Sequence, residues 1–211
     1  MVYYPINLNL NGRKVVVVGG GRIAERKITR LIEAMAVVTV ISPKLTLELM
    51  EYAEEGKLIW KEKNFTAADI QDAFLVIAAT NQPEINHAVK KAAAPHQLIS
   101  LVDDPEESNF ILPAVMNQGK LSITISTSGA SPILAKKIKQ EIADQYGPEY
   151  KEYVDFLYSC RKRIIEEIDD PKIKKLLLLD LTEPTYLHSK TRHEDFEEKM
   201  NQRLDHDLHD Q

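Results

Sequence analysis

A run of four valines followed at once by three glycines constrains the fold of this chain more than any other feature. The valines, Val15–Val18, predict a buried strand, and the glycines, Gly19–Gly21, come directly before a helical pattern. From Gly19 to Ala24 the spacing is G-x-G-x-x-A, which is typical of the phosphate-binding turn of dinucleotide folds. In such a turn Gly19 allows the tight bend and Gly21 lets a pyrophosphate approach, while the helix N-terminus offers free N–H groups.

The segments around this turn strengthen the interpretation, because glycine-rich turns alone are common. A helical pattern covers Arg22–Glu33, and a second β-branched run, Val37–Ile41, follows at the distance of a crossover. Together they predict a strand–helix–strand unit with parallel strands. The alternative is a tight turn in an α/β protein that binds no cofactor.

Strand and helix patterns alternate through the first half of the chain. Five strands are expected, at Lys14–Val18, Val37–Ile41, Leu58–Lys61, Leu75–Ala78 and Leu98–Leu101. Three helices are expected between them, at Arg22–Glu33, Leu45–Glu55 and Pro83–Ala94. This alternation predicts an α/β fold of the Rossmann type over residues 1–112, in which helices cover both faces of a parallel sheet.

The pattern changes after Asp103-Asp104-Pro105. Short extended segments are expected at Asn109–Leu112 and Ala114–Met116, followed by a turn at Asn117–Lys120 and a half-buried strand at Leu121–Ser126. A polar loop then leads into a helix that runs from Ile133 to Gln145. We therefore expect residues 113–146 to form a small strand and helix segment that supplies sheet edges for a partner subunit.

Residues 147–211 are expected to form a helical C-terminal module. Helices are predicted at Glu149–Ile168 and Pro171–Leu181, and Pro184 interrupts the pattern. The last segment, Glu194–Leu208, is rich in charge and poor in core residues. We expect this segment to be the least ordered part of the chain.

Composition argues against several classes of protein. Hydrophobic residues make up 44% and charged residues 28% of the chain, the balance of a globular protein with a core. The net charge of −5 argues against nonspecific nucleic-acid binding. The single cysteine excludes an internal disulfide, and the histidines form no metal-binding set, so no metal is expected. Since no membrane span or signal peptide is found, the expected location is the cytoplasm.

The residues after the second strand do not distinguish NAD from NADP. An acidic residue commonly binds the ribose 2′-hydroxyl there, but this chain has Ser42-Pro43-Lys44. Lys44 and Arg22 favour a 2′-phosphate and therefore NADP. Ser42 or backbone groups are equally able to bind the ribose of NAD.

Two further candidates follow the fourth and fifth strands, at the edge where ligands bind in open α/β sheets. Thr80-Asn81 is a candidate for the nicotinamide side of a cofactor, and the alternative is that Asn81 caps the helix at Pro83. Asp103-Asp104 offers a carboxylate to take a proton from a substrate that loses a hydride. The alternative there is an Asx turn before Pro105.

The loop Ser126–Ser131 offers hydroxyl and N–H groups at the start of a helix, which suits a carboxylate or a phosphate. The alternative is a helix cap, with Ser131 at the N-cap and Pro132 at the first helical position. The two roles are compatible. The following helix carries three lysines that are expected to form a solvated face, Lys136, Lys137 and Lys139.

Several segments, taken in order, resemble one known family. They are Tyr4–Ile6, Val15–Lys27, Val38–Pro43, Ala78–Asn81, Leu101–Asp103, Asn109–Ala114 and Ser126–Ala135. In content and order these segments resemble the N-terminal modules of siroheme synthases, over about residues 3–145. The chain is similar to the free-standing precorrin-2 dehydrogenases of that family.

The resemblance implies a homodimer that uses NAD to oxidise precorrin-2, a tetrapyrrole, to sirohydrochlorin. Its active site would lie between the nucleotide domain and the partner's dimerisation segment. Asp103 matches the catalytic aspartate, and the serine-rich loop that faces the substrate matches Ser126, Thr127 and Ser128. The implied cofactor contacts are Gly19, Gly21, Arg22, Ile23, Pro43 and Lys44, and Ser42, Thr80 and Asn81 complete the candidate set by position.

Two departures from the family pattern affect the expectations. Relatives usually have glycine where this chain has Met35, before the second strand, and a left-handed residue there would cost on the order of 1 kcal/mol. The chain ends at Gln211, so no methyltransferase activity is expected.

Other activities remain as alternatives. Some family members also insert ferrous iron, but without a compact ligand cluster we favour dehydrogenase activity alone. An NAD-sensing regulatory domain would share the first half of the chain, but it needs neither Asp103 nor the loop Ser126–Pro132. A tetrapyrrole carrier would bind the substrate and leave NAD unreduced.

Overall fold

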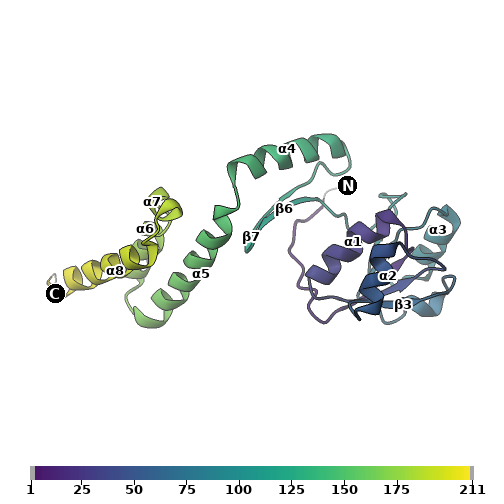
Figure 1. The fold of residues 1–211 in the computed structure, drawn as a ribbon, viewed down its shortest axis with the longest axis horizontal. Coiled ribbons are helices and arrows are strands. Elements are labelled where there is room, and N and C mark those ends of the chain that lie inside the picture. The colour runs from purple at the N-terminus through teal and green to yellow at the C-terminus, as the bar shows by residue number, and fades with distance from the viewer. Residues whose placement is uncertain (1–2, 210–211) are drawn as a thin grey trace. The chain divides into compact units, whose positions relative to one another are not determined.

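The structure, a computed structural model, describes residues 3–209 and contains two compact units (Figure 1). The first unit ends at Leu112 and the second begins at Pro113. The functional assignment of residues 1–112, 113–146 and 147–211 to separate domains stays a prediction.

The first unit is a five-stranded parallel sheet in the order β3-β2-β1-β4-β5. Its strands are β1 (Lys14–Val18), β2 (Val37–Ile41), β3 (Ile59–Lys61), β4 (Leu75–Ala78) and β5 (Leu98–Leu101). Its helices are α1 (Arg22–Glu33), α2 (Leu47–Glu54), α3 (Pro83–Ala92) and a 3-10 turn η1 (Ala67–Ile70) that the sequence patterns did not predict. The expected Rossmann-type α/β fold is therefore confirmed.

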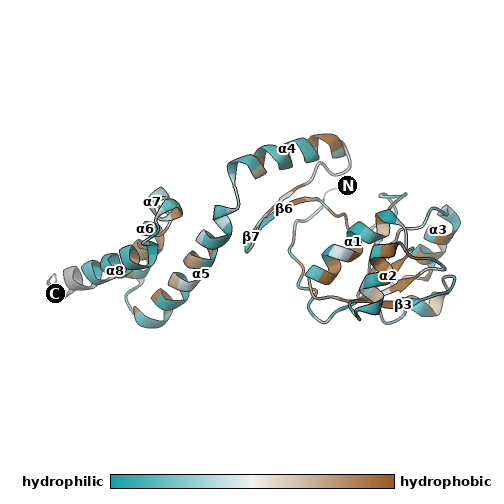
Figure 2. Cartoon of the chain, viewed as in Figure 1, coloured by the Kyte–Doolittle hydropathy of each residue, from teal (hydrophilic) through white to brown (hydrophobic). Residues whose placement is uncertain are grey.

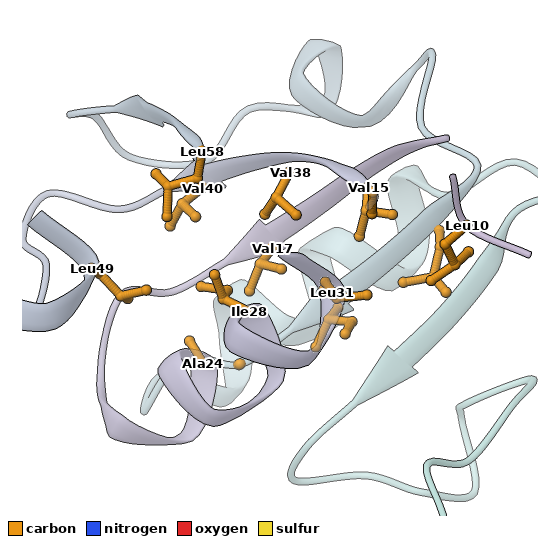
Figure 3. Packing of buried hydrophobic residues seen from close by; sticks show 14 residues of the cluster. Leu10, Val15, Val17, Ala24, Ile28, Leu31, Val38, Val40, Leu49 and Leu58 are labelled. Carbon is orange, nitrogen blue, oxygen red and sulfur yellow. The ribbon is translucent and has the colours of Figure 1, made fainter. Parts of the chain in front are cut away.

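Alternate residues of β1 pack against helices on opposite faces of the sheet. Val15 and Val17 lie in a cluster with Ala24 and Ile28 of α1 (Figure 3). Val16 and Val18 lie in a second cluster, which includes Val89 of α3. Because both faces of the strand are covered, its sequence is apolar without interruption. Figure 2 shows apolar residues along the strands and a mixture of polar and apolar residues along the helices.

The helix stop at Met35 has the left-handed geometry that its position predicts. Met35 has a φ of 57°, its N–H donates to Ile32 O at 2.8 Å, and the N–H of Ala36 donates to Leu31 O at 3.0 Å. This pair of bonds is the Schellman motif, in which glycine is the usual residue at the position of Met35. The side chain of Met35 is 56% exposed, so it contributes little packing to offset the strain.

The second unit begins with a β-hairpin and continues as helices (Figure 1). Strands β6 (Ala114–Gln118) and β7 (Leu121–Ile125) pair antiparallel around Gly119, which has a φ of 60°. The helices are α4 (Pro132–Gln145), α5 (Glu149–Glu167), α6 (Pro171–Asp180), α7 (Pro184–His188) and α8 (Arg192–His209).

The end of the chain follows the first of its two expectations and departs from the second. Pro184 does interrupt the pattern after α6, but it also begins α7, where a missing N–H costs nothing. The segment Glu194–Leu208 is not an unstructured tail, because it lies within α8. Its residues Phe196 and Met200 are buried in a cluster with residues of α5, α6 and α7. These two apolar side chains lie four residues apart, on one face of a mostly polar and charged helix, and they pack this face against the cluster.

Candidate active site

Four strands of the first sheet end level with one another, which brings the loops that follow them to one edge. Val18 of β1 pairs with Ile41 of β2 and with Ala78 of β4, and Ala78 pairs with Leu101 of β5. The order of the strands reverses direction between β1 and β4, and ligands of open α/β sheets bind at such a point. The loops after these strands hold the first-unit site residues predicted from the sequence.

The glycine turn after β1 fits closely against its neighbours. Gly19 has a φ of 119°, and a Cβ added there would lie 2.3 Å from the carbonyl oxygen of Ala79. A Cβ on Gly20 would lie 2.3 Å from the carbonyl oxygen of Lys44. Gly21, in contrast, faces open space, because apart from its chain neighbours no described residue has an atom within 4 Å of a Cβ built there. The turn is thus packed on its inner side and open at Gly21.

The N-terminus of α1 extends this open surface. Gly21 is the N-cap of α1, and among the described residues no side chain accepts a hydrogen bond from the first-turn N–H groups. Arg22 and Ile23 are exposed, Ile23 by 54%. Uncapped N–H groups with a nearby guanidinium form an anion site. The residues present therefore fit the pyrophosphate of a dinucleotide.

The loop after β2 contains no carboxylate, and its one hydroxyl bonds within the loop. Ser42 is buried, and its Oγ donates to the carbonyl oxygen of Lys44 at 2.7 Å. Pro43 and Lys44 are exposed. The residues that the sequence placed on the adenosine side thus lie beside the glycine turn, on the same edge of the sheet.

The turn after β4 is held by a residue that the sequence patterns did not single out. Asn86 of α3 is fully buried, and its Oδ1 accepts from the N–H of Thr80 at 3.2 Å and from its hydroxyl at 2.8 Å. The Nδ2 group of Asn86 donates to Thr80 O at 3.2 Å. Asn81 does not cap α3, because the N-cap is Gln82 and it makes no side-chain cap. The sequence offered one signal for this role, because Asn86 is a polar residue on the face of α3 that is buried, and a buried polar side chain needs hydrogen-bond partners.

Asp103 lines a pocket of about 620 Å³ beyond the end of β5. The other residues of the pocket are Pro83, Glu84, His87, Leu101 and Asp104. Three of these residues come from the first turns of α3, at the spacing that places side chains on one helix face. His87, which the sequence did not single out, lies in the pocket with Asp103.

The two neighbouring aspartates of this loop differ in their contacts. The Oδ1 of Asp104 accepts from the N–H of Glu107 at 3.2 Å, so this carboxylate serves the turn. Ser108 is buried, accepts from the N–H of Leu101 at 2.9 Å and donates to Asp104 O at 3.0 Å. The carboxylate of Asp103 is exposed and makes no hydrogen bond or ion pair with another described residue. Asp103 is thus the aspartate available to a ligand.

The serine-rich loop of the second unit is held by its own hydroxyl groups. Ser131 caps α4 by accepting from the N–H of Leu134 at 3.2 Å, as predicted. The hydroxyl oxygens of Ser126 and Thr127 accept from the N–H groups of Ser128 and Ser131, at 3.1 and 3.0 Å. Ser128 has a φ of 50°, which marks a tight left-handed bend.

The described part of the chain gives two further findings. None of its helices is long and apolar enough to cross a membrane. None of its groups of three or more histidine, cysteine, aspartate or glutamate side chains is arranged to hold a metal ion.

Family models match three successive segments of the chain. Residues 6–114 match a model described as putative NAD(P)-binding. Residues 118–145 match a model described as sirohaem biosynthesis protein central, and residues 150–196 match the SirC C-terminal domain.

Comparisons with individual proteins agree with these models. The precorrin-2 dehydrogenase of Priestia megaterium is 35% identical over 194 residues, which cover 92% of this chain and 96% of that protein. The precorrin-2 dehydrogenase of Bacillus subtilis is 32% identical over 159 residues, which cover 75% of this chain and 98% of that protein. A solved structure of SirC, a precorrin-2 dehydrogenase, superposes with a TM-score of 0.84 at 34% identity, covering 95% of this chain and all of that one. The chain belongs to the precorrin-2 dehydrogenase family.

Proposed function

We infer that this chain oxidises precorrin-2 to sirohydrochlorin with NAD as the hydride acceptor, a step of siroheme biosynthesis. One observation carries the inference beyond family membership. The sheet edge that holds the open glycine turn also holds the pocket with the exposed carboxylate of Asp103. A dinucleotide site and a proton acceptor at one edge are the two elements that a dehydrogenation needs.

The cofactor contacts are proposed from the loops along this edge. The uncapped first turn of α1, with Gly21, Arg22 and Ile23, would bind the pyrophosphate. Gly19 shapes the turn, and Ser42, Pro43 and Lys44 would face the adenosine side. Thr80 and Asn81 would face the nicotinamide side. Bound NAD supplies the group that accepts a hydride from the substrate.

Asp103 is proposed as the residue that takes the proton. Oxidation removes a hydride and a proton from the macrocycle, so a base has to receive the proton as the hydride leaves. The exposed, uncommitted carboxylate of Asp103 is suited to this role, whereas the carboxylate of Asp104 is engaged with the N–H of Glu107. The substrate carries several carboxylates, and we propose that the loop Ser126, Thr127 and Ser128 binds one of them through its hydroxyl and N–H groups.

We also propose that the protein is a homodimer in the cytoplasm. The hairpin of β6 and β7 packs against α4, and the outer edges of its two strands pair with no other described strand. At the start of α4, Ile133 is 84% and Leu134 47% exposed within the chain. Pairing with a second copy would satisfy the strand edges and cover these side chains. Light scattering during size-exclusion chromatography tests the dimer, and a monomer at micromolar concentration would contradict it.

The test of the function is a turnover assay with purified protein, precorrin-2 and NAD. We expect NADH to appear in step with the sirohydrochlorin spectrum. A parallel assay with NADP tests the cofactor, because the loop after β2 also carries Lys44. Binding of NAD without turnover of any tetrapyrrole would instead indicate a regulatory domain. Binding of precorrin-2 with NAD left unreduced would indicate a carrier.

A further inference from the structure

The single tryptophan of the chain lies beside the loop proposed to meet the adenosine half of NAD. Trp60 is the middle residue of β3, and its half-buried ring packs against the cluster that contains Val38 and Val40 of β2. Its indole Nε1 donates a hydrogen bond to the carbonyl oxygen of Ser42 at 2.9 Å. Ser42 is the first residue after β2, so this bond joins an edge strand to the start of the cofactor loop.

Further contacts connect Ser42 to the glycine turn. The hydroxyl of Ser42 donates to Lys44 O at 2.7 Å, and that carbonyl lies where a Cβ on Gly20 would be only 2.3 Å away. The N–H of Thr46 donates to Gly20 O at 3.0 Å, which closes the loop onto the turn. The contacts therefore run without a gap from the indole of Trp60 to the backbone of the glycine turn.

We propose that Trp60 is a positioning residue for NAD, which acts by holding the loop Ser42–Lys44 in the conformation that receives the adenosine half of the cofactor. The inference rests on the proposed function and extends it to a residue outside the expected contact set. Because the loop has no carboxylate to bind the ribose, its backbone shape carries the recognition. A bond that fixes this shape before binding reduces the ordering that binding must otherwise supply.

The substitution Trp60→Phe tests this role, because it keeps an aromatic ring in the cluster and removes the N–H donor. A net neutral hydrogen bond corresponds to about a three- to tenfold change in an equilibrium constant. We expect the dissociation constants of NAD and of ADP-ribose, measured by calorimetry, to rise by about this factor. The kcat for precorrin-2 oxidation at saturating NAD should stay close to that of the unchanged protein.

Tyr52→Phe is a matched control in the same cluster. The hydroxyl of Tyr52 donates to Glu48 Oε1 at 3.0 Å, a bond within α2 that includes no residue of the cofactor loop. If Trp60 is only a packing residue, both variants will bind ADP-ribose like the unchanged protein, and the proposal is overturned. If the unchanged protein binds no NAD at all, the proposed function falls together with this inference.

The fluorescence of Trp60 gives a second measurement that needs no stable variant. Since the chain has one tryptophan, its emission reports on this indole alone. Because the bond to Ser42 O holds the loop before binding, we expect saturating ADP-ribose, which lacks the nicotinamide, to leave the wavelength of maximum emission unchanged. A shift of this maximum that follows the binding curve measured by calorimetry would show that the indole and the loop rearrange on binding, and would overturn the proposal.

Discussion

Replacing Asn86 by leucine should weaken both the fold and the cofactor site of the first unit. Asn86 is fully buried and makes three hydrogen bonds to one residue, Thr80, at 3.2, 2.8 and 3.2 Å. Leucine has the same branched arrangement of four side-chain heavy atoms but a larger volume, so the substitution removes these bonds, leaves no cavity and crowds the neighbouring side chains. It therefore tests the polar contribution to the turn after β4, with crowding as an added cost.

The expected loss follows from the three bonds. At 0.5–1.5 kcal/mol for each neutral bond, the sum lies between about 1.5 and 4.5 kcal/mol. Thr80 is half-buried, and its hydroxyl keeps the contacts with Gln82, so water and these contacts recover part of the loss. We expect a decrease of about 2 kcal/mol in the free energy of unfolding, measured by urea denaturation. Without these bonds the turn after β4 is less restrained, so fewer protein molecules hold it in the conformation that binds NAD. The affinity for NAD should therefore fall as well.

Gln97 offers a matched control at the opposite end of the strands. It is a buried amide just before β5, and it also makes three hydrogen bonds, to Ile70 O, Ala73 O and the N–H of Ala94. Gln97→Met should cost a similar amount of stability and leave NAD affinity unchanged. If Asn86→Leu binds NAD as tightly as Gln97→Met does, Asn86 supports only the fold and the reasoning about the turn is wrong.

Three further predictions concern single residues. Asp103→Asn should reduce kcat for precorrin-2 oxidation by at least about 100-fold with NAD affinity unchanged, while Asp104→Asn, which keeps the oxygen that accepts from Glu107, should retain most activity. Met35→Gly should raise the free energy of unfolding by about 0.5–1 kcal/mol in urea denaturation, because glycine removes the left-handed strain; unchanged or lower stability would contradict this. Burial raises the pKa of the Cys160 thiol to about 11 from its ordinary 9.0, so the unfolded state loses its proton first and stability falls between about pH 9 and pH 11. Cys160→Ala should lose less stability over that range, and equal losses in the two proteins would refute the assignment.

Local chemistry explains why so much of the first unit could be predicted. The run Val15–Val18 has to be buried on both faces, and the glycine turn that follows has few possible conformations. The level ends of the parallel strands then bring Ser42, Thr80 and Asp103 to one edge, as expected. These predictions depend only on the pattern of apolar residues along each strand and on the residues that directly follow the strand.

The residues that hold the site could not be predicted in the same way. Asn86 and Ser108 bond to backbone groups that lie six or seven residues away, across the end of a strand. Trp60 reaches Ser42 from a neighbouring strand, eighteen residues away. Such contacts depend on the packed arrangement of the strands, which no local pattern records. The same reason explains the error at α8, where Phe196 and Met200 are buried only because α5, α6 and α7 surround them.

The contrast between Asp103 and Asp104 shows how packing gives neighbouring, chemically identical residues different roles. Where β5 ends, Ser108 satisfies the N–H of Leu101 and the carbonyl of Asp104, and the Asp104 carboxylate satisfies the N–H of Glu107. With the backbone of the turn satisfied by these groups, the carboxylate of Asp103 is not needed for the fold. It therefore stays exposed in the pocket, and neither of its oxygens bonds to another described residue. A base that removes a proton from a substrate also has to be exposed and unbonded. The structural work of Ser108 and Asp104 thus makes Asp103 available for chemistry.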